Sequence, residues 1–259
     1  MPPTDFAFDA LAATYDAQFT DSRIGTLMRQ AVWQRLDACF HPGQRILELN
    51  CGTGADAVYL GQYGVRVLAT DLSPAMVQIT RQKVARAGLT AMVQVQQLAL
   101  ENIAALKAAP FDGALSNFGG LNCVADLAGV GRALAAQLHH GALVLLCLMG
   151  PLVPWEWGWF LCHGAPVTAF RRLRPSGVVW RGLTIHYPSI GTLRRAFSPA
   201  FRLRRASALG ALLPPPFAEG WIGKYPRLLA LLNRWERRLE ACPPLPWLAD
   251  HYVLELQRM

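Results

Sequence analysis

Short apolar runs alternate with amphipathic stretches through the middle of the chain. The runs predict strands near residues 45–49, 65–70, 92–97, 112–117 and 142–149, and helical periodicity predicts helices near 54–63, 74–87 and 123–139. Strands and helices that alternate in this way form a parallel sheet with helices on both faces. The pattern therefore predicts an α/β fold.

The two ends of the chain have different patterns. Residues 22–40 carry apolar positions at helical spacing and stop at His41-Pro-Gly43. Later segments predict a strand over 178–187, helices over 188–197 and 225–239, and an antiparallel pair over 201–208 and 251–257. We expect a single domain over 1–259, divided into an N-terminal helical cover (1–43), a core (44–150), a cap (151–200) and final strands with a helical insertion (201–259).

The most informative turn follows the first predicted strand, in Arg45-Ile-Leu-Glu-Leu-Asn-Cys-Gly-Thr-Gly-Ala-Asp56. Gly52 and Gly54 let the backbone turn tightly beneath a ligand, and the amide groups that open the next helix face that ligand. Asp71 ends the second strand, 23 residues after Glu48, where a ribose diol would lie. Together these features predict a nucleoside-binding crevice.

The same glycines also fit the dinucleotide fingerprint, but two carboxylates argue against a dinucleotide. Glu48 lies inside the strand, where a carboxylate serves a ligand with an ammonium group rather than a pyrophosphate. Asp56 lies in the first helical turn, where it would repel a diphosphate. The sequence therefore favours a nucleoside that carries a positive charge.

The segment Glu48-Leu-Asn-Cys-Gly-Thr-Gly54 resembles the first motif of the class I S-adenosylmethionine (SAM)-dependent methyltransferases, with Asn50 where the family commonly has Gly. The segments 71–76, 111–117 and 140–146 resemble the parts of that family around its second, fourth and fifth strands. This resemblance covers residues 44–149. It implies a Rossmann-like class I methyltransferase fold, with a seven-stranded, mostly parallel sheet, a C-terminal antiparallel strand and a Trp-rich cap inserted after strand 5.

The resemblance also implies SAM as cofactor and S-adenosylhomocysteine as product. Glu48 would lie near the methionine ammonium and Asp71 would bind the ribose hydroxyls. Many members carry an Asp after the third strand that bonds the adenine amino group; this chain has Leu98 there, so Glu101 or a backbone group replaces it. The expected cofactor-binding residues are Tyr15, Glu48, Asn50, Cys51, Gly52, Thr53, Gly54, Asp71, Leu72, Met76, Leu100, Glu101 and Asn117.

Tyr15 is included because Thr14-Tyr-Asp-Ala-Gln-Phe19 resembles the segment with which many small-molecule methyltransferases close over the cofactor. Packing of the N-terminal helix explains this tyrosine equally well. Both interpretations stay open from the sequence.

Net positive charge and tryptophan are concentrated in the second part of the chain. Residues 1–150 hold 10 Lys and Arg against 11 Asp and Glu, whereas residues 151–259 hold 15 against 6 and seven of the eight tryptophans. The arginines there are either solvated surface or attract an anionic substrate, a membrane surface or nucleic acid. Since this family usually builds its substrate cover in this part, we expect it to decide the substrate.

The proline-bounded segment 151–163 contains Trp155, Trp157 and Trp159, which are either core residues or a lid that keeps the crevice dry. We favour the lid. Asn122 is either a helix cap or a substrate contact. His163, His186 and Tyr187 are weak candidates for a catalytic base. The expected substrate-binding residues are Asn122, Trp155, Trp157, Trp159 and His163.

These features favour a cytoplasmic methyltransferase that acts on a hydrophobic small molecule, most readily at an oxygen atom. The N-terminus lacks a secretory pattern, no apolar stretch is long enough to span a bilayer, and the six cysteines show no metal-ligand spacing, so we expect no metal. No sequence feature predicts the oligomeric state.

Two alternatives remain. A sequence pI near 9.5 favours an RNA or DNA methyltransferase, but Ser116-Asn-Phe-Gly lacks the Asn/Asp-Pro-Pro-aromatic pattern of base-amino methylases, so nucleic acid is the less favoured partner. A non-catalytic SAM-binding regulatory protein is supported only by the lack of a secure base.

Overall fold

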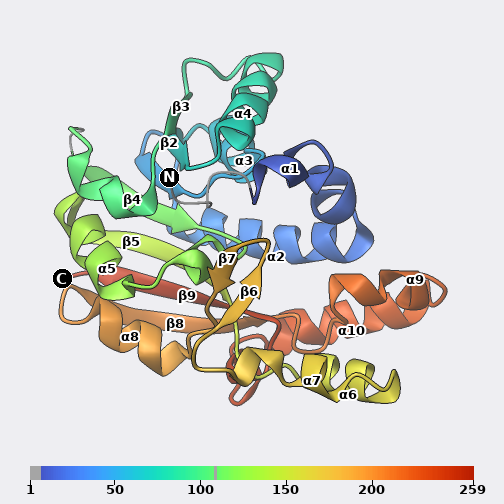
Figure 1. The fold of residues 1–259 in the computed structure, drawn as a ribbon. Coiled ribbons are helices and arrows are strands. Elements are labelled where there is room, and N and C mark those ends of the chain that lie inside the picture. The colour runs from blue at the N-terminus through green and yellow to red at the C-terminus, as the bar shows by residue number, and fades with distance from the viewer. Residues whose placement is uncertain (1–6, 108–109) are drawn as a thin grey trace.

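A seven-stranded sheet forms the centre of the computed structural model, which describes residues 7–107 and 110–259 (Figure 1). The strand order is β3-β2-β1-β4-β5-β9-β8, and β9 is antiparallel to both of its neighbours. The strands are β1 (Arg45–Leu49), β2 (Arg66–Asp71), β3 (Val93–Gln97), β4 (Phe111–Ser116), β5 (Leu138–Met149), β8 (Phe201–Leu209) and β9 (His251–Arg258). This topology confirms the predicted mostly parallel sheet with a C-terminal antiparallel strand.

Helices cover both faces of the sheet. They are α2 (Arg23–Cys39), α3 (Ala55–Gln62) and α4 (Pro74–Arg86) on one face, and α5 (Leu127–Ala136) and α8 (Ile190–Phe197) on the other. Consecutive strand residues point to opposite faces, so Ile46 packs with the first group and Leu47 with the second. The strands thus separate two apolar cores, as expected for an α/β fold.

Several helices begin at a residue that the sequence marks as a cap. Ser73 accepts a hydrogen bond from the Met76 amide, and Pro74 occupies the first position of α4. Asp126 caps α5 and Ser189 caps α8 in the same way. These caps fix where each helix starts relative to the strand ends.

Shorter elements connect these strands and helices. They are α1 (Asp9–Ala12), η2 (Asp16–Thr20), η3 (Leu100–Ala105), η4 (Gly120–Cys123), α6 (Pro154–Cys162), α7 (Pro166–Ala169), η5 (Arg171–Leu173), β6 (Val178–Trp180), β7 (Leu183–Ile185), η6 (Pro216–Ala218), α9 (Glu219–Ile222), α10 (Pro226–Leu239) and η7 (Leu245–Trp247).

The strand expected over 178–187 is instead a hairpin, β6–β7. Arg181 and Gly182 both have positive φ, at 51° and 82°, as a two-residue hairpin turn with the right-handed strand twist requires. Figure 1 shows this hairpin in front of the sheet. The hairpin, together with Arg171 and Tyr187 of the cap segment, reaches the site described below.

Arg172 anchors the cap segment to the sheet. Its buried guanidinium donates to Glu156 of α6 at 2.7 Å, to the Asp250 carboxylate at 2.6 Å, and to the carbonyls of Gly150 and Asp250. Burial opposes ionisation of Asp250, but Arg172 and His251 hold the pKa of its carboxyl well below the usual range. The cap is therefore joined to the residues next to β5 and β9 through paired charges and hydrogen bonds.

Candidate functional site

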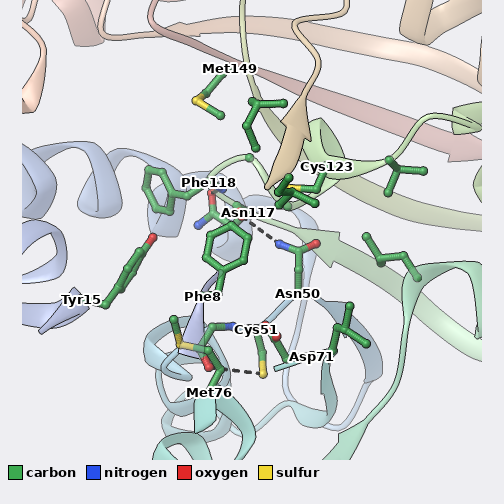
Figure 2. A pocket seen from close by; sticks show the side chains of 18 of the residues that line it. Phe8, Tyr15, Asn50, Cys51, Asp71, Met76, Asn117, Phe118, Cys123 and Met149 are labelled. Carbon is green, nitrogen blue, oxygen red and sulfur yellow. Dashed lines mark hydrogen bonds between the residues drawn. The ribbon is translucent and has the colours of Figure 1, made fainter. Parts of the chain in front are cut away.

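One large cleft opens at the carboxyl ends of β1, β2 and β4 and has a volume of about 870 Å³ (Figure 2). Among the predicted cofactor residues, its lining includes Tyr15, Asn50, Cys51, Gly52, Thr53, Asp71, Leu72, Met76, Leu100, Glu101 and Asn117. Glu48 and Gly54 lie beside this lining rather than in it. Parallel strands that end at one edge explain why residues so far apart in the sequence meet here.

The turn after β1 has three residues with positive φ: Asn50 at 50°, Gly52 at 55° and Gly54 at 78°. Asn tolerates this conformation better than most side chains, which explains why it can stand where the family has Gly. Its amide donates to the Asn117 carbonyl at 3.0 Å, and its oxygen accepts from the Ser116 hydroxyl at 2.7 Å. Asn50 thus fixes the end of β1 against the end of β4.

The Asp71 carboxylate is held in place by the backbone. One oxygen accepts from the Gly52 amide at 2.8 Å and the other from the Ser73 amide at 2.9 Å. Burial raises the pKa of this carboxyl, and the two amide hydrogen bonds partly oppose that change. Each oxygen retains a further lone pair that can accept a hydrogen bond from a ligand in the cleft.

Glu48 is only 1% exposed, and its Oε2 atom has no hydrogen-bond partner among the described residues. Burial, together with the nearby Asp56 charge, raises the pKa of this carboxyl well above its usual range, although Arg29 opposes the change. An unpartnered carboxylate is costly in such surroundings. The position is therefore suited to a ligand that brings a positive charge.

Asp56 organises the opposite wall of the cleft. Its carboxylate accepts from Arg29 Nη1 at 2.8 Å, from Trp33 Nε1 at 2.7 Å and from Asn117 Nδ2 at 2.8 Å. Burial disfavours the Arg29 charge, but the adjacent Asp56 raises the pKa of its guanidinium above the ordinary value. Asp56 therefore has a structural role that its place in the first helical turn did not predict.

Arg29 lines the cleft and is a residue that the sequence reasoning missed. Its guanidinium lies 4.7 Å from the centroid of the Phe118 ring. A signal was available, because Arg29 shares a helical face with Val32 and Leu36 and is thus a charged residue on an apolar face. A buried arginine at such a position requires a carboxylate partner elsewhere in the fold.

The N-terminal segment covers the glycine turn. Asp16 of η2 accepts from the Thr53 hydroxyl at 2.7 Å and pairs with Lys83 of α4 at 2.5 Å. Tyr15 lines the cleft and also packs on Phe19, with ring centroids 5.9 Å apart, and its contact with the cofactor stays a prediction. Burial raises the pKa of Tyr15 to about 12, which keeps its hydroxyl protonated at neutral pH.

The side of the cleft beyond the glycine turn is mainly apolar. It is lined by Phe8, Phe118, Cys123, Met149, Val178, Trp180, Leu183 and Ile185. Trp180 of the hairpin packs on Phe8, with ring centroids 5.6 Å apart, so the hairpin and the N-terminal segment meet across the cleft. Burial raises the pKa of the Cys123 thiol to about 12, which leaves it a neutral wall residue.

The structure corrects the expected position of the tryptophan lid. Trp155, Trp159 and His163 line a second, more open pocket with Trp221, while Trp157 packs on Phe170. The physical reason is that Pro154 starts a helix, α6, and residues two apart on a helix point in diverging directions. The tryptophan of the cap that reaches the main cleft is Trp180 of the hairpin.

The remaining predicted residues are also placed differently from the expectation. Asn122 is buried and clamps backbone groups: its amide donates to the His186 carbonyl at 2.6 Å and to the Met149 carbonyl, and its oxygen accepts from the Met149 amide. Asn122 does not cap α5, because Asp126 provides that cap. It also lies outside the lining of the main cleft. Of the three base candidates, Tyr187 lines the cleft, whereas His186 does not and His163 is exposed and stacked on Trp159.

The described residues contain no cluster of His, Cys, Asp or Glu side chains with the arrangement of a metal site. Over the same ranges, none of the helices has the length and apolar character needed to cross a membrane.

The site fits SAM on three observations. The space beside Gly52 is open to a ligand, Glu48 has an unpartnered oxygen for a positive charge, and Asp71 has free lone pairs for a diol. These groups lie at the carboxyl edge of the sheet, where nucleoside ligands bind in such folds.

Comparison with known proteins gives independent evidence. Residues 46–141 match the model of a family described as a methyltransferase domain. A ubiquinone biosynthesis O-methyltransferase of Xanthomonas axonopodis pv. citri is 32% identical over 104 residues, which cover 40% of this chain and 42% of that protein. An S-adenosyl-L-methionine-dependent Diels-Alderase of Talaromyces variabilis is 33% identical over 75 residues, or 29% of this chain and 26% of that protein.

The matched part spans less than half the length of these curated relatives. The solved structure of an S-adenosylmethionine-dependent methyltransferase from Mesorhizobium loti superimposes with a TM-score of 0.56 at 20% identity, over 88% of this chain and 98% of that one. At this identity the likeness is one of fold. The sheet topology, the cleft and these matches agree that residues 46–141 form a methyltransferase domain and that the chain has the fold of the class I methyltransferases.

Proposed function

We propose that this protein transfers a methyl group from SAM to a hydrophobic small molecule, with an oxygen atom as the acceptor. The observation that carries this proposal is the main cleft, which combines the glycine turn and Asp71 with an apolar far side. Its volume of about 870 Å³ is near the upper end of the range of about 300–1,000 Å³ typical of ligand pockets. That volume supports binding of both a cofactor and an acceptor.

In this proposal Glu48 serves the methionine ammonium, Asp71 the ribose hydroxyls, and Leu72, Met76, Leu100 and Glu101 surround the adenine end. Bound SAM supplies an electrophilic methyl group on a sulfonium. The chain's own contribution is to orient the two reactants and to exclude water, and such positioning can account for much of an enzyme's rate enhancement. Phe118, Met149 and the hairpin side chains supply the dry surroundings.

We expect Glu48→Gln to weaken SAM binding about tenfold, because the ammonium would lose a charge-assisted hydrogen bond. The same change should stabilise the ligand-free protein at neutral and higher pH. The folded pKa of Glu48 is raised above its unfolded value, so its contribution to stability is complete below the unfolded pKa and is lost as pH rises through the folded pKa. Thermal unfolding from pH 5 to 9, with and without SAM, measures both effects.

If Glu48→Gln leaves the SAM affinity at the level of the original protein, the ammonium assignment is contradicted. Asp21→Asn is the control, because Asp21 is an exposed acid outside the cleft lining.

The pairing of the charged side chains in the cleft supports an apolar acceptor molecule. The two arginines in its lining, Arg29 and Arg171, are paired with Asp56 and Glu156 at 2.8 Å and 2.7 Å. Little positive charge therefore remains there for phosphate groups, which supports a small molecule over RNA or DNA. An oxygen acceptor is supported by the O-methyltransferases among the relatives.

We also propose that residues 151–200 form the substrate cover, through the hairpin and Tyr187, and that Tyr187 is the base candidate to test first. A cytoplasmic location is supported by the cysteines, all six of which are unpaired thiols.

The substrate class is tested with labelled SAM and two extracts, one of total RNA and one of apolar small molecules. We expect label in the apolar extract and none in RNA, and we expect Asp71→Ala to reduce the transfer strongly at limiting SAM. Label in RNA alone would overturn the proposed substrate class. If a compound in the extract is consumed only when SAM is present, yet receives no label, the reaction would instead resemble the one named for the Diels-Alderase relative.

A further inference from the structure

The outward face of α10 is both apolar and basic. Six of its larger exposed side chains form one stripe along the helix, because each lies three or four residues from another member of the set. They are Arg227, Leu228, Leu231, Arg234, Trp235 and Arg238. Leu231 is 50% exposed and Trp235 45%, although large apolar side chains in such a row are normally covered.

The acidic residues of the same segment point the other way. Glu236 is buried and accepts hydrogen bonds from the backbone amides of residues 210–213, at 2.6 to 3.1 Å. Glu240 is buried and pairs with Arg205 at 3.1 Å and with Arg237. Since both carboxylates bond to groups inside the protein, they do not neutralise the arginines of the outward face.

Aromatic residues extend this face toward α6. Tyr225 is 50% exposed and its ring centroid lies 5.9 Å from that of Trp221, which in turn lies 6.5 Å from that of Trp159. Figure 1 shows α6, α9 and α10 gathered at one end of the molecule. We call this surface, made of the α10 stripe with Trp221 and Tyr225, the α10 patch.

The chemistry of the α10 patch narrows the choice of partner. A second copy in a two-fold dimer would place the same arginines against each other, which like charges disfavour. Nucleic acid would use the arginines and aromatic rings, but Leu228 and Leu231 have no ring face on which a base can stack. A row of Trp, Tyr and Leu interleaved with Arg fits the boundary between lipid headgroups and acyl chains.

We propose that the α10 patch docks the protein on the surface of an anionic phospholipid bilayer. The arginine side chains lie along the surface with their guanidinium groups on lipid phosphates, while Leu231 and Trp235 enter the headgroup boundary. The guanidinium of Arg238 lies 5.7 Å from the centroid of the Trp235 ring, so the charged and apolar groups of the stripe are already adjacent.

Ring contacts connect the wall of the main cleft to the α10 patch, since Phe217 packs on Trp159 and Trp159 on Trp221. Arg171 lines the cleft and its guanidinium lies 5.2 Å from the centroid of the Phe160 ring, which packs on Phe217 at 5.2 Å. Phe217 is 45% exposed beside α9.

Vesicle flotation of the full chain tests the docking without any measurement of activity. Vesicles of phosphatidylcholine alone are compared with vesicles that contain phosphatidylglycerol at about one third of the lipid. A basic residue near an anionic surface contributes about fivefold in affinity, so Arg234→Gln with Arg238→Gln should reduce partitioning more than tenfold. Leu231→Ser with Trp235→Ser should reduce it by a similar factor.

Matched controls change exposed residues on the other part of the chain: Arg86→Gln with Arg132→Gln for charge, and Tyr63→Ser for apolar surface. These controls should bind anionic vesicles like the original protein, and all variants should melt within a few degrees of it. Equal binding by the patch and control variants would overturn the proposal, as would the absence of binding to anionic vesicles. Binding of RNA or self-association that requires the patch, without vesicle binding, would also overturn it.

Discussion

Replacing Asp56 by Ala should lower the free energy of unfolding by about 3–5 kcal/mol, because the change leaves the Arg29 charge buried without its partner. Both side chains are only 6% exposed, and Asp56 also accepts from Trp33 and Asn117. Urea denaturation of the ligand-free protein measures this loss. Asp126→Ala, which removes an exposed helix cap, should cost only about 1 kcal/mol and is the control.

The double variant Asp56→Ala with Arg29→Met separates two explanations of that loss. If the orphaned guanidinium causes most of the cost, removing it should restore a large part of the stability, because a buried ion pair can often be replaced by apolar groups. A double variant less stable than Asp56→Ala alone would contradict this reasoning. It would then locate the cost in the lost contacts of Trp33 and Asn117.

Replacing Asp71 by Ala should weaken SAM binding by about 2 kcal/mol or more. The carboxylate is positioned by the Gly52 and Ser73 amides and would bond to the ribose hydroxyls, and charge-assisted hydrogen bonds of this kind are among the stronger ones. Isothermal titration calorimetry measures the affinity, and circular dichroism checks that the substitution has not unfolded the domain. Unchanged SAM affinity would remove Asp71 from the site.

A second ligand distinguishes the roles of Asp71 and Glu48. Methylthioadenosine has the adenine and ribose of SAM but lacks the amino-acid group. Asp71→Ala should therefore weaken both ligands, whereas Glu48→Gln should weaken SAM alone. Equal losses for both ligands in the Glu48→Gln variant would show that Glu48 acts by supporting the turn rather than by meeting the ammonium.

Local features of the sequence were sufficient to predict the central strands and the turns that follow them. The strands near 45–49 and 112–117 and the helices that follow Gly54 and Ser73 were predicted within a few residues. Their signals are apolar periodicity, caps and glycine, all of which act over a few neighbouring positions. The carboxylates Glu48 and Asp71 were found for the same reason, since each lies at a fixed place relative to its strand.

The distant contacts required the tertiary structure. The Arg29–Asp56 pair joins residues 27 positions apart, and the Asn122 clamp joins η4 to the residues next to β7 and to the end of β5. No local pattern reports such pairs, because their partners are chosen by how helices and sheet pack. Arg29 gave a sign of being buried, but nothing near it in the sequence identified its partner.

The cover of the cleft also shows which features local sequence predicts and which require the tertiary structure. The sequence by itself determined that a Trp-rich, basic segment follows β5, and it determined the fold, the glycine turn and the two acids that point to SAM. Only the tertiary structure decided that Trp180 faces the cleft and that Trp155 and Trp159 face a second pocket. The reason is that composition fixes how much apolar surface a segment carries, whereas the direction of each side chain depends on whether the backbone becomes a helix or a hairpin and on what it packs against.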